Sequence, residues 1–429
     1  MSLPTRSSAG APARGAASVA IATTVDQMLS SASNALMVFV LAQVSSAGEF
    51  GIIGVPITLV AVCVGFNRGA LGATLLLTSN LINRQRVEES GYALTWSLYT
   101  GGVGGFLILT LGAVFHQPWI GLAFAIALPA VLAQDVLRLA AIAHGRPNLA
   151  VVADALWAAS MLGIFVANLF GVRESAEFSI YLWAFSGLVS AGILAFGLRV
   201  VPRHSRILDW WRTDWAARLR IGSVYAVGQI GYVFVTLAAV TTAGSVAAAG
   251  IRGATTLFGP IVMLLSAMPT VFVPHAVRTG SSVGDQWRLV SRTSVATSVL
   301  TVVTIGCLMA APARLGTALL GASWPETLLV LPYIGVKAAA MCWTVGVSTV
   351  FQSQGESRTV FRLNMLLTGL EIGTSFAAGL IFRSAIAIAI SLAFSGSVTA
   401  ILGALCVHRS IHYTVADPSC DRPCSEEIC

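Results

Sequence analysis

The stretch AAAGIRGATTLFGPIVMLLSAMPTVFVPHAVR, residues 247–278, carries the features that decide the fold. It is long enough to cross a bilayer, because about 20 apolar residues rising 1.5 Å each span roughly 30 Å of hydrocarbon. Arg252 lies inside it, and a charge at such depth usually faces a bundle interior or a water-filled cavity. Gly259 and Pro260 weaken the helix near its middle and free a carbonyl that only neighbouring helices or a cavity can satisfy. The stretch is typical of a translocation path; the alternative is a kinked packing helix whose arginine reaches outward.

The composition is that of a membrane protein. Of the 429 residues 56% are hydrophobic and 10% are charged, and the mean hydropathy is +0.82. Soluble domains carry about 25% charged residues. The formal net charge is +7, but the arginines lie between apolar segments rather than in a domain, so membrane orientation explains them better than a nucleic-acid partner.

Apolar segments predict an all-α polytopic fold of about twelve membrane-spanning helices. The segments are 24–44, 50–79, 92–115, 119–143, 150–171, 178–200, 222–242, 247–277, 293–312, 326–351, 362–382 and 385–407. With this assignment eighteen arginines fall in connections and tails on one side, against Arg173, Arg314 and Arg383 on the other. Because positive charge is retained inside, both termini are predicted in the cytoplasm of a bacterium, with the chain in its cytoplasmic (inner) membrane.

The segments divide into two lobes joined by a linker. The predicted organisation is a disordered cytoplasmic N-terminus 1–17, an N-lobe 18–200, an interfacial linker 201–221, a C-lobe 222–407 and a cytoplasmic tail 408–429. Trp210, Trp211 and Trp215 stand among arginines in the linker, a pattern that favours anchoring in the headgroup layer over a binding role.

The two lobes resemble each other in sequence. HGRPNLAVVADAL (144–156) matches QGESRTVFRLNML (354–366) at a constant offset, with Gly145 on Gly355 and Asp154 on Asn364. The match predicts two six-helix repeats of the same orientation. Transporters built from repeats hold their substrate where the repeats meet.

Arg68 and Arg252, one from each lobe, are the candidate anion-binding residues. Neither helix supplies an acidic partner within one turn, and the planar guanidinium donates paired hydrogen bonds to phosphate. Gly65, Gly69 and Gly72 surround Arg68 and indicate either a cavity wall or a close helix contact.

The other ionisable residues of the spans have mostly local explanations. Asp135 and Arg138 stand three apart and are expected to pair. Asp154 is expected to complement a helix dipole, and Asp26, near a helix start, to form a cap or a gate contact.

Lys337 and Glu371 lie near mid-membrane on neighbouring predicted helices. They form either an ion-coupling site for protons or sodium ions or a static buried ion pair.

No enzyme motif accompanies these residues, so the sequence predicts no catalytic residue, no cofactor and no metal site. The outer loop before residue 50 offers only Glu49, and there is no phosphate-binding loop of the Walker type. Cys420, Cys424 and Cys429 lie in the tail without a zinc-ligand spacing. The rival class, a polytopic glycosyltransferase or ligase, requires catalytic carboxylates in an outer loop.

Four stretches resemble the multidrug/oligosaccharidyl-lipid/polysaccharide exporter superfamily in its lipid-linked oligosaccharide flippase branch. They are VDQMLSSASNALMVFVLAQ (25–43), GIRGATTLFGPIVMLLSAMPTVFVPHAVR (250–278), LLGASWP (319–325) and AHGRPNLAVVADALWA (143–158). The resemblance implies two six-helix lobes in the V shape of MATE transporters. It also implies a central cavity faced by Arg68, Arg252, Asp26 and Gln229 as substrate contacts.

The function expected from the resemblance is export of a polyprenyl-diphosphate-linked saccharide by alternating access. The implied partners are this anionic saccharide, membrane lipids and glycosyltransferases or a polymerase of the same pathway. The alternative within the superfamily is a multidrug or small-solute antiporter.

Overall fold

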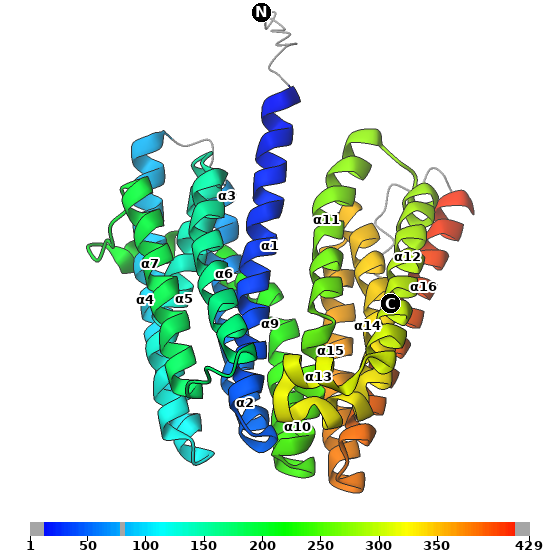
Figure 1. Cartoon of the computed structure of the whole chain (residues 1–429). Helices are drawn as coiled ribbons and strands as arrows, with labels where there is room; N and C mark the ends of the chain where they lie inside the picture. The colour runs from blue at the N-terminus through cyan, green and yellow to red at the C-terminus, as the bar shows by residue number, and fades with distance from the viewer. Residues whose placement is uncertain (1–12, 78–81, 417–429) are drawn as a thin grey trace, which may run out of the picture.

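The computed structural model describes residues 13–77 and 82–416 (Figure 1), and every element in these ranges is helical. Eleven helices are long and apolar enough to cross a membrane, and α10 with α11 form a twelfth span bent by 49°. This confirms the predicted all-α fold of about twelve spans.

The first bundle contains six spans. Its helices are α1 (Ala13–Val44), α2 (Ala47–Asn67) continued by the π-helical turn η1 (Arg68–Gly72) and α3 (Ala73–Leu77), α4 (Asn83–Val114), α5 (Pro118–Ala143), α6 (Pro147–Leu169) and α7 (Ala176–Leu198).

The second bundle follows a short helix, α8 (Ile207–Thr213). Its elements are α9 (Trp215–Ala238) with the π-helical turn η3 (Ala239–Ala243), α10 (Ser245–Leu257), α11 (Gly259–Thr279), α12 (Val283–Ala310), α13 (Ala313–Leu320) with the 3₁₀ turn η4 (Gly321–Ser323), α14 (Trp324–Ser353), α15 (Ser357–Phe382) and α16 (Ala385–Ala416).

Several helix ends differ from the predicted bounds. Helix α1 begins within the N-terminal segment predicted to be disordered, and α16 runs beyond residue 407. Helix α9 takes up the last residues of the predicted linker, and α13 was not expected at all. The three tail cysteines lie outside the described residues. Apolar runs locate the membrane-buried part of a helix but say little about how far it continues into polar surroundings.

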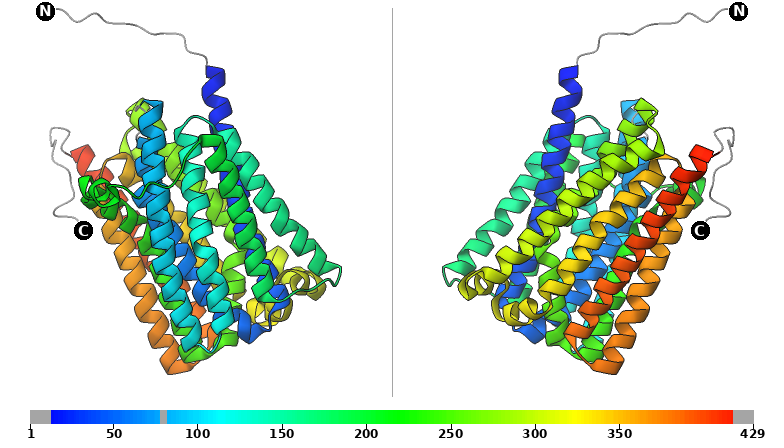
Figure 2. Two further views of the ribbon diagram at one scale, coloured as in Figure 1. Left: turned by 90° about the vertical axis from the view of Figure 1, so that its left-hand side faces the viewer. Right: turned by 90° about the vertical axis from the view of Figure 1, so that its right-hand side faces the viewer.

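The two bundles lean apart toward one end of the molecule (Figure 1). Helix α1 begins and α16 finishes at this end (Figures 1 and 2). We name it the terminal face and the opposite end the junction end. Helices α1 and α11 diverge toward the terminal face (Figure 1). Helices α2 and α9 stay in contact, because a Cβ on Gly54 would lie 3.4 Å from Thr236 and one on Gly69 would lie 2.7 Å from the carbonyl oxygen of Ile221.

The bundles are tied together at the junction end. A Cβ on Gly51 of α2 would collide with the backbone carbonyl of Ser245, so glycine allows α2 to meet the start of α10. The side chain of Gln43 donates to the carbonyl of Ala318 at 2.5 Å and accepts from Asn168 at 3.1 Å. These contacts close that end.

The internal repeat is visible in the backbone. Gly145 and Gly355 have φ values of +71° and +77°, in the left-handed region that favours glycine. The N–H after each glycine donates to a carbonyl in the preceding helix, Arg146 to Ala141 at 2.8 Å and Glu356 to Phe351 at 2.9 Å. The turn after α5 and the turn after α14 therefore have the same build.

The linker tryptophans pack mainly against protein. The Trp211 ring stacks on Trp96 of α4 at 4.2 Å between centroids. The Trp210 indole donates to Glu89 at 2.6 Å, and the Arg218 guanidinium lies 3.6 Å above its ring. The predicted headgroup position thus fits the exposed Trp215, while the other two dock α8 onto the first bundle.

The break between α10 and α11 occurs at Gly259 and Pro260, as the sequence predicts. Pro260 has no N–H to donate to the carbonyl of Thr256, and the N–H of Phe258 donates to it instead. The freed carbonyl is therefore satisfied within the chain by a tight last turn, without the cavity or neighbouring helix that was expected to serve it.

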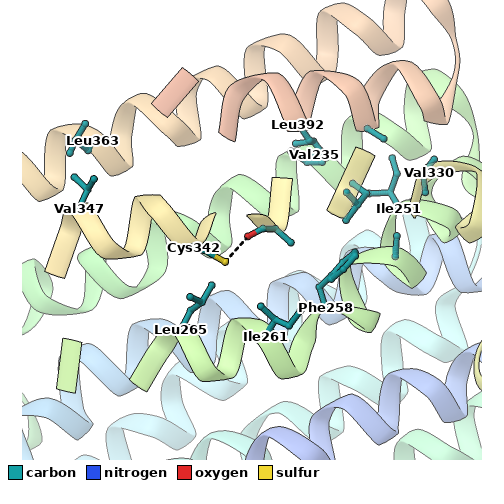
Figure 3. Packing of buried hydrophobic residues seen from close by; sticks show 14 of the residues in the cluster. Val235, Ile251, Phe258, Ile261, Leu265, Val330, Cys342, Val347, Leu363 and Leu392 are labelled. Carbon is teal, nitrogen blue, oxygen red and sulfur yellow. Dashed lines mark hydrogen bonds between the residues drawn. The ribbon is translucent and has the colours of Figure 1, made fainter. Parts of the chain in front are cut away.

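The core of the second bundle is apolar and comes from α9, α10, α11, α12, α14, α15 and α16, and Figure 3 shows part of it. Phe258, at the break, is 2% exposed and packs there beside Ile261. Cys342 behaves as a small hydrophobic residue, with its thiol donating to the carbonyl of Ala338 at 3.3 Å (Figure 3).

Candidate functional site

Five charged side chains form a buried cluster inside the first bundle, which we name the N-lobe cluster. It comprises Asp26 of α1, Arg68 of η1, Asp135 and Arg138 of α5, and Asp154 of α6. One turn of α5 supplies the centre, because residues three apart share a helix face.

Two arginines share the carboxylate of Asp135. Arg68 donates through Nε to both oxygens at 3.0 Å and through Nη2 to Oδ1 at 2.8 Å. Arg138 donates through Nη2 to the same Oδ1 at 3.0 Å and through Nη1 to Asp26 Oδ2 at 2.9 Å. The predicted Asp135–Arg138 pair is confirmed, and it is the middle of a larger network.

The cluster carries one negative charge more than its arginines balance. Asp154 approaches Arg138 only to 4.0 Å through Oδ2, an atom without a hydrogen-bond partner among the described residues. Gln134 donates to the other oxygen of Asp154. Asp26 and Asp154 are fully buried. An uncompensated negative charge at such depth is costly, so we expect the cluster to bind a proton or a small cation.

Three expectations about these residues are wrong. Asp26 lies well inside α1, which begins at Ala13, so a helix cap is wrong, while its ion pair with Arg138 leaves the alternative of a gate contact as a prediction. Asp154 lies two turns into α6 and faces Gln134 rather than acting on the helix dipole. Arg68 has an acidic partner, and it comes from another helix, which inspection of its own helix could not reveal.

A second polar site lies inside the second bundle. Lys337 Nζ of α14 is 2.7 Å from Glu371 Oε1 of α15 and 4.4 Å from the ring centroid of Tyr232 of α9. All three line a cavity of about 320 Å³ that also reaches Thr344 and Asn364. The predicted ion pair is confirmed, and both of its residues line the cavity.

Arg252 stands where α10 faces α2. The described residues place no carboxylate within 4.0 Å of its guanidinium, and its buried Nε has no hydrogen-bond partner. The side chain of Tyr232 is close enough to Arg252 to interact with its charge. Among the three arginines Arg68, Arg138 and Arg252, the first two have carboxylate partners in the described structure and Arg252 has none.

Arg68 and Arg252 are not brought together in this conformation. The Arg252 side chain lies beside Gly54, because a Cβ there would be 3.9 Å from Arg252 Cγ. Gly54 is about four turns before Arg68 on the same helix, or roughly 20 Å of helix rise. One diphosphate cannot span that distance.

The glycines around Arg68 serve helix packing rather than a cavity wall. A Cβ on Gly65 would lie 3.1 Å from the carbonyl oxygen of Tyr225 and 3.6 Å from Gln229 Cγ, and Gly72 faces Leu139. Gln229 thus lies at the contact of α2 with α9, about one turn from Arg68.

Gln134 and Tyr232 are site residues that the sequence did not single out. Gln134 had one available signal, a polar side chain next to Asp135 in an apolar span. Tyr232 had none, because a lone tyrosine in a spanning helix is ordinary.

No protein-family model and no curated protein matches this chain. Solved structures do match across nearly its whole length. An inward-facing multidrug resistance MATE family transporter of the MOP superfamily is 15% identical, with 92% of this chain and 96% of that chain covered and a TM-score of 0.69. The outward-facing conformation of a MATE family transporter is also 15% identical, with 95% of this chain and 98% of that chain covered and a TM-score of 0.61.

A third match is a MOP superfamily transporter from Pyrococcus furiosus, for which reverse polarity of the binding pocket suggests a different function. It is 15% identical, with 95% of this chain and 97% of that chain covered and a TM-score of 0.56. The chain therefore has the fold of MATE transporters of the MOP superfamily.

Proposed function

We propose that this chain is a flippase of the bacterial cytoplasmic membrane, which moves an anionic lipid-linked saccharide to the outer leaflet by alternating access. The observation that carries the proposal is Arg252, a guanidinium between the bundles with no carboxylate near it. A polyprenyl diphosphate supplies the missing anion, and charge-assisted hydrogen bonds to it are roughly twice as strong as neutral ones.

The arrangement of the bundles supports alternating access. The TM-score is higher for the inward-facing MATE structure, 0.69, than for the outward-facing one, 0.61. Helices α1 and α11 diverge at the terminal face (Figure 1), which the arginine distribution predicts to be cytoplasmic. A headgroup therefore enters from the inner leaflet while its polyprenyl tail stays in lipid.

The side chains decide the sign of the substrate charge, because transporters of this fold differ in the polarity of their binding pockets. In the second bundle Glu371 balances the charge of Lys337, whereas Arg252 has Tyr232 beside it and no carboxylate within 4.0 Å among the described residues, which leaves one positive charge in excess. Arg252 is the primary contact in this proposal. Arg68 joins it only in a conformation in which Asp135 releases it.

Coupling to an ion gradient has two candidate sites. The N-lobe cluster carries the excess negative charge that a proton or sodium ion balances. The Lys337–Glu371 pair lines a cavity and changes its net charge if Glu371 takes up a proton. At either site, uptake of the cation favours either the inward-facing or the outward-facing arrangement of the two bundles.

The second candidate function is multidrug or small-solute antiport. The 320 Å³ cavity with Tyr232 and Glu371 favours it, since a small organic cation that displaces the ammonium of Lys337 fits an aromatic ring beside a carboxylate. Efflux of cationic dyes from cells, unaffected by loss of Arg252, is the result expected for this function. If the chain were instead a membrane glycosyltransferase or ligase, the purified protein would show sugar-transfer activity.

The test is a leaflet-specific assay of lipid-linked saccharide in liposomes that contain the purified chain. Arg252→Ala is expected to abolish most flipping, Arg252→Lys to restore part of it and Arg252→Glu to be worse than Ala, because sign rather than size matters. Arg173→Ala, at an exposed site outside the bundles, is the control. Normal flipping by well-folded Arg252→Glu contradicts the proposal.

A further inference from the structure

A groove of about 830 Å³ opens between the first turns of α9 and α15. Three arginines line it, Arg220 from α9 and Arg358 and Arg362 from α15. None of them belongs to the N-lobe cluster or to the cavity around Lys337. All three lie near the start of a candidate span, at the depth of lipid headgroups.

Helices α9 and α15 run parallel, and the groove lies between their first turns because the two helices come into contact only nearer their middles. A Cβ on Gly231 of α9 would lie 3.2 Å from Thr368 Cγ2 of α15, so the helices touch there. Arg220 and Arg358 each stand about three turns before that contact, which places them at the same level on opposite walls. The space between the walls above the contact is the groove.

The orientation of Arg220 is fixed by its neighbour on the helix. Arg218 is 4% exposed and stacks over Trp210 on the side of the first bundle. Two residues farther along a helix the side chain points to nearly the opposite face. Arg220 is accordingly exposed and turned to the groove.

The groove is amphipathic along its length. The described residues place no carboxylate within 4.0 Å of Arg220 or Arg362. On the α9 wall the apolar Val224 and Tyr225, 44% and 54% exposed, lie about one turn farther from the rim than Arg220, and on the α15 wall Phe361, 44% exposed, stands between Arg358 and Arg362. A free phosphate ion uses only the rim, whereas an amphiphile with a phosphate head and an acyl chain matches both parts.

We propose that this groove binds the phosphate headgroup of an anionic diacyl phospholipid, with an acyl chain against Val224, Tyr225 and Phe361. The three guanidinium groups donate to the phosphate oxygens, which is the chemistry by which basic pockets between spanning helices hold anionic lipids. Because α9 also packs against α2, the lipid holds together the two helices beside the lobe contact. None of the three arginines is one of the proposed substrate contacts.

The experiment uses the full chain, purified and delipidated in a zwitterionic detergent, with native mass spectrometry after addition of phosphatidylglycerol or phosphatidylcholine. Wild type is expected to retain at least about tenfold more phosphatidylglycerol. The variant R220Q/R358Q/R362Q is expected to lose that preference. The matched control R84Q/R288Q/R292Q removes the same charge from exposed arginines near the terminal face and is expected to keep it.

Thermal unfolding supplies the second measurement. Phosphatidylglycerol is expected to raise the Tm of wild type and of the control but not that of the groove variant. If the triple variant does not fold, Arg362→Gln alone is expected to reduce the shift.

Equal loss of lipid preference in both triple variants overturns the proposal, because it indicates unspecific surface charge. Displacement of the lipid by an equal concentration of glycerol phosphate overturns it in favour of a soluble anion. Stronger retention of a polyprenyl phosphate than of phosphatidylglycerol overturns it in favour of the transported lipid.

Discussion

The guanidinium of Arg68 donates to both carboxylate oxygens of Asp135, with Nε 3.0 Å from each and Nη2 2.8 Å from Oδ1. The contact joins the π-helical turn of α2 to the middle of α5. Since Arg138 uses the same carboxylate, Asp135 compensates two arginines at once. The three carboxylates of the N-lobe cluster are therefore not equivalent.

Asp135→Asn and Asp154→Asn make the same change in charge at two positions of one cluster. Asp135→Asn deprives Arg68 and Arg138 of their shared partner and is expected to cost about 3–5 kcal/mol of unfolding free energy. Asp154→Asn removes a carboxylate that lies 4.0 Å from Arg138 and is expected to leave stability unchanged or higher. Thermal unfolding in one detergent compares them, and equal losses contradict this ranking.

Arg68 and Arg252 are expected to respond differently to alanine. Arg68→Ala removes three hydrogen bonds to Asp135 and is expected to cost about 1–3 kcal/mol of stability. Arg252→Ala removes a guanidinium without a carboxylate partner, so it is expected to fold normally and to lose flipping. Unfolding and flipping are measured on the same preparations. A large stability loss in Arg252→Ala, with flipping intact, assigns Arg252 to packing.

Glu371→Gln tests coupling through the second bundle. The amide keeps the shape of the side chain in the 320 Å³ cavity but cannot exchange a proton. The variant is expected to fold and bind substrate yet to transport without dependence on the ion gradient. Asp154→Asn is measured beside it. Unchanged gradient dependence in Glu371→Gln excludes coupling through Glu371, and its loss in Asp154→Asn alone assigns coupling to the N-lobe cluster.

Membrane orientation is tested with single cysteines in a background without the native ones. Glu174 lies between α6 and α7, and Arg314 lies in α13, both at the junction end. Cysteines at these sites are expected to react with an impermeant reagent in intact cells. A cysteine at Arg288 in α12 is expected not to react, because the terminal face is predicted to be cytoplasmic. Labelling at Arg288 in intact cells reverses the orientation.

His144 adds a pH dependence at the turn between α5 and α6. Burial, then the neighbouring Arg86 and Arg146, holds the pKa of His144 below its ordinary value of 6.5. The neutral ring is thus favoured in the fold, so its contribution to stability is present above pH 6.5 and declines as pH falls toward the lowered pKa. His144→Gln, which copies Gln354 of the second repeat, is expected to reduce the loss of Tm on acidification. An unchanged pH profile excludes His144 as its source.

The membrane class, the span count and the repeat could be predicted from the amino-acid sequence. Apolar runs of fixed length are a local property, because each residue in lipid faces the same solvent and each helix satisfies its own backbone. The glycines at 145 and 355 likewise act within one turn. The Asp135–Arg138 pair could be predicted for the same reason, since its members are three residues apart on one helix.

The pairing of charges between helices could not be predicted from the sequence. Arg68 and Asp135 come from different helices, as do Arg138 and Asp26, and no spacing along one helix encodes such contacts. The same holds for the 830 Å³ groove, whose walls belong to α9 and α15. Interactions between helices depend on their packing and rotation, which is why Arg68 and Arg252 looked alike in sequence and only Arg252 lacks a carboxylate partner among the described residues.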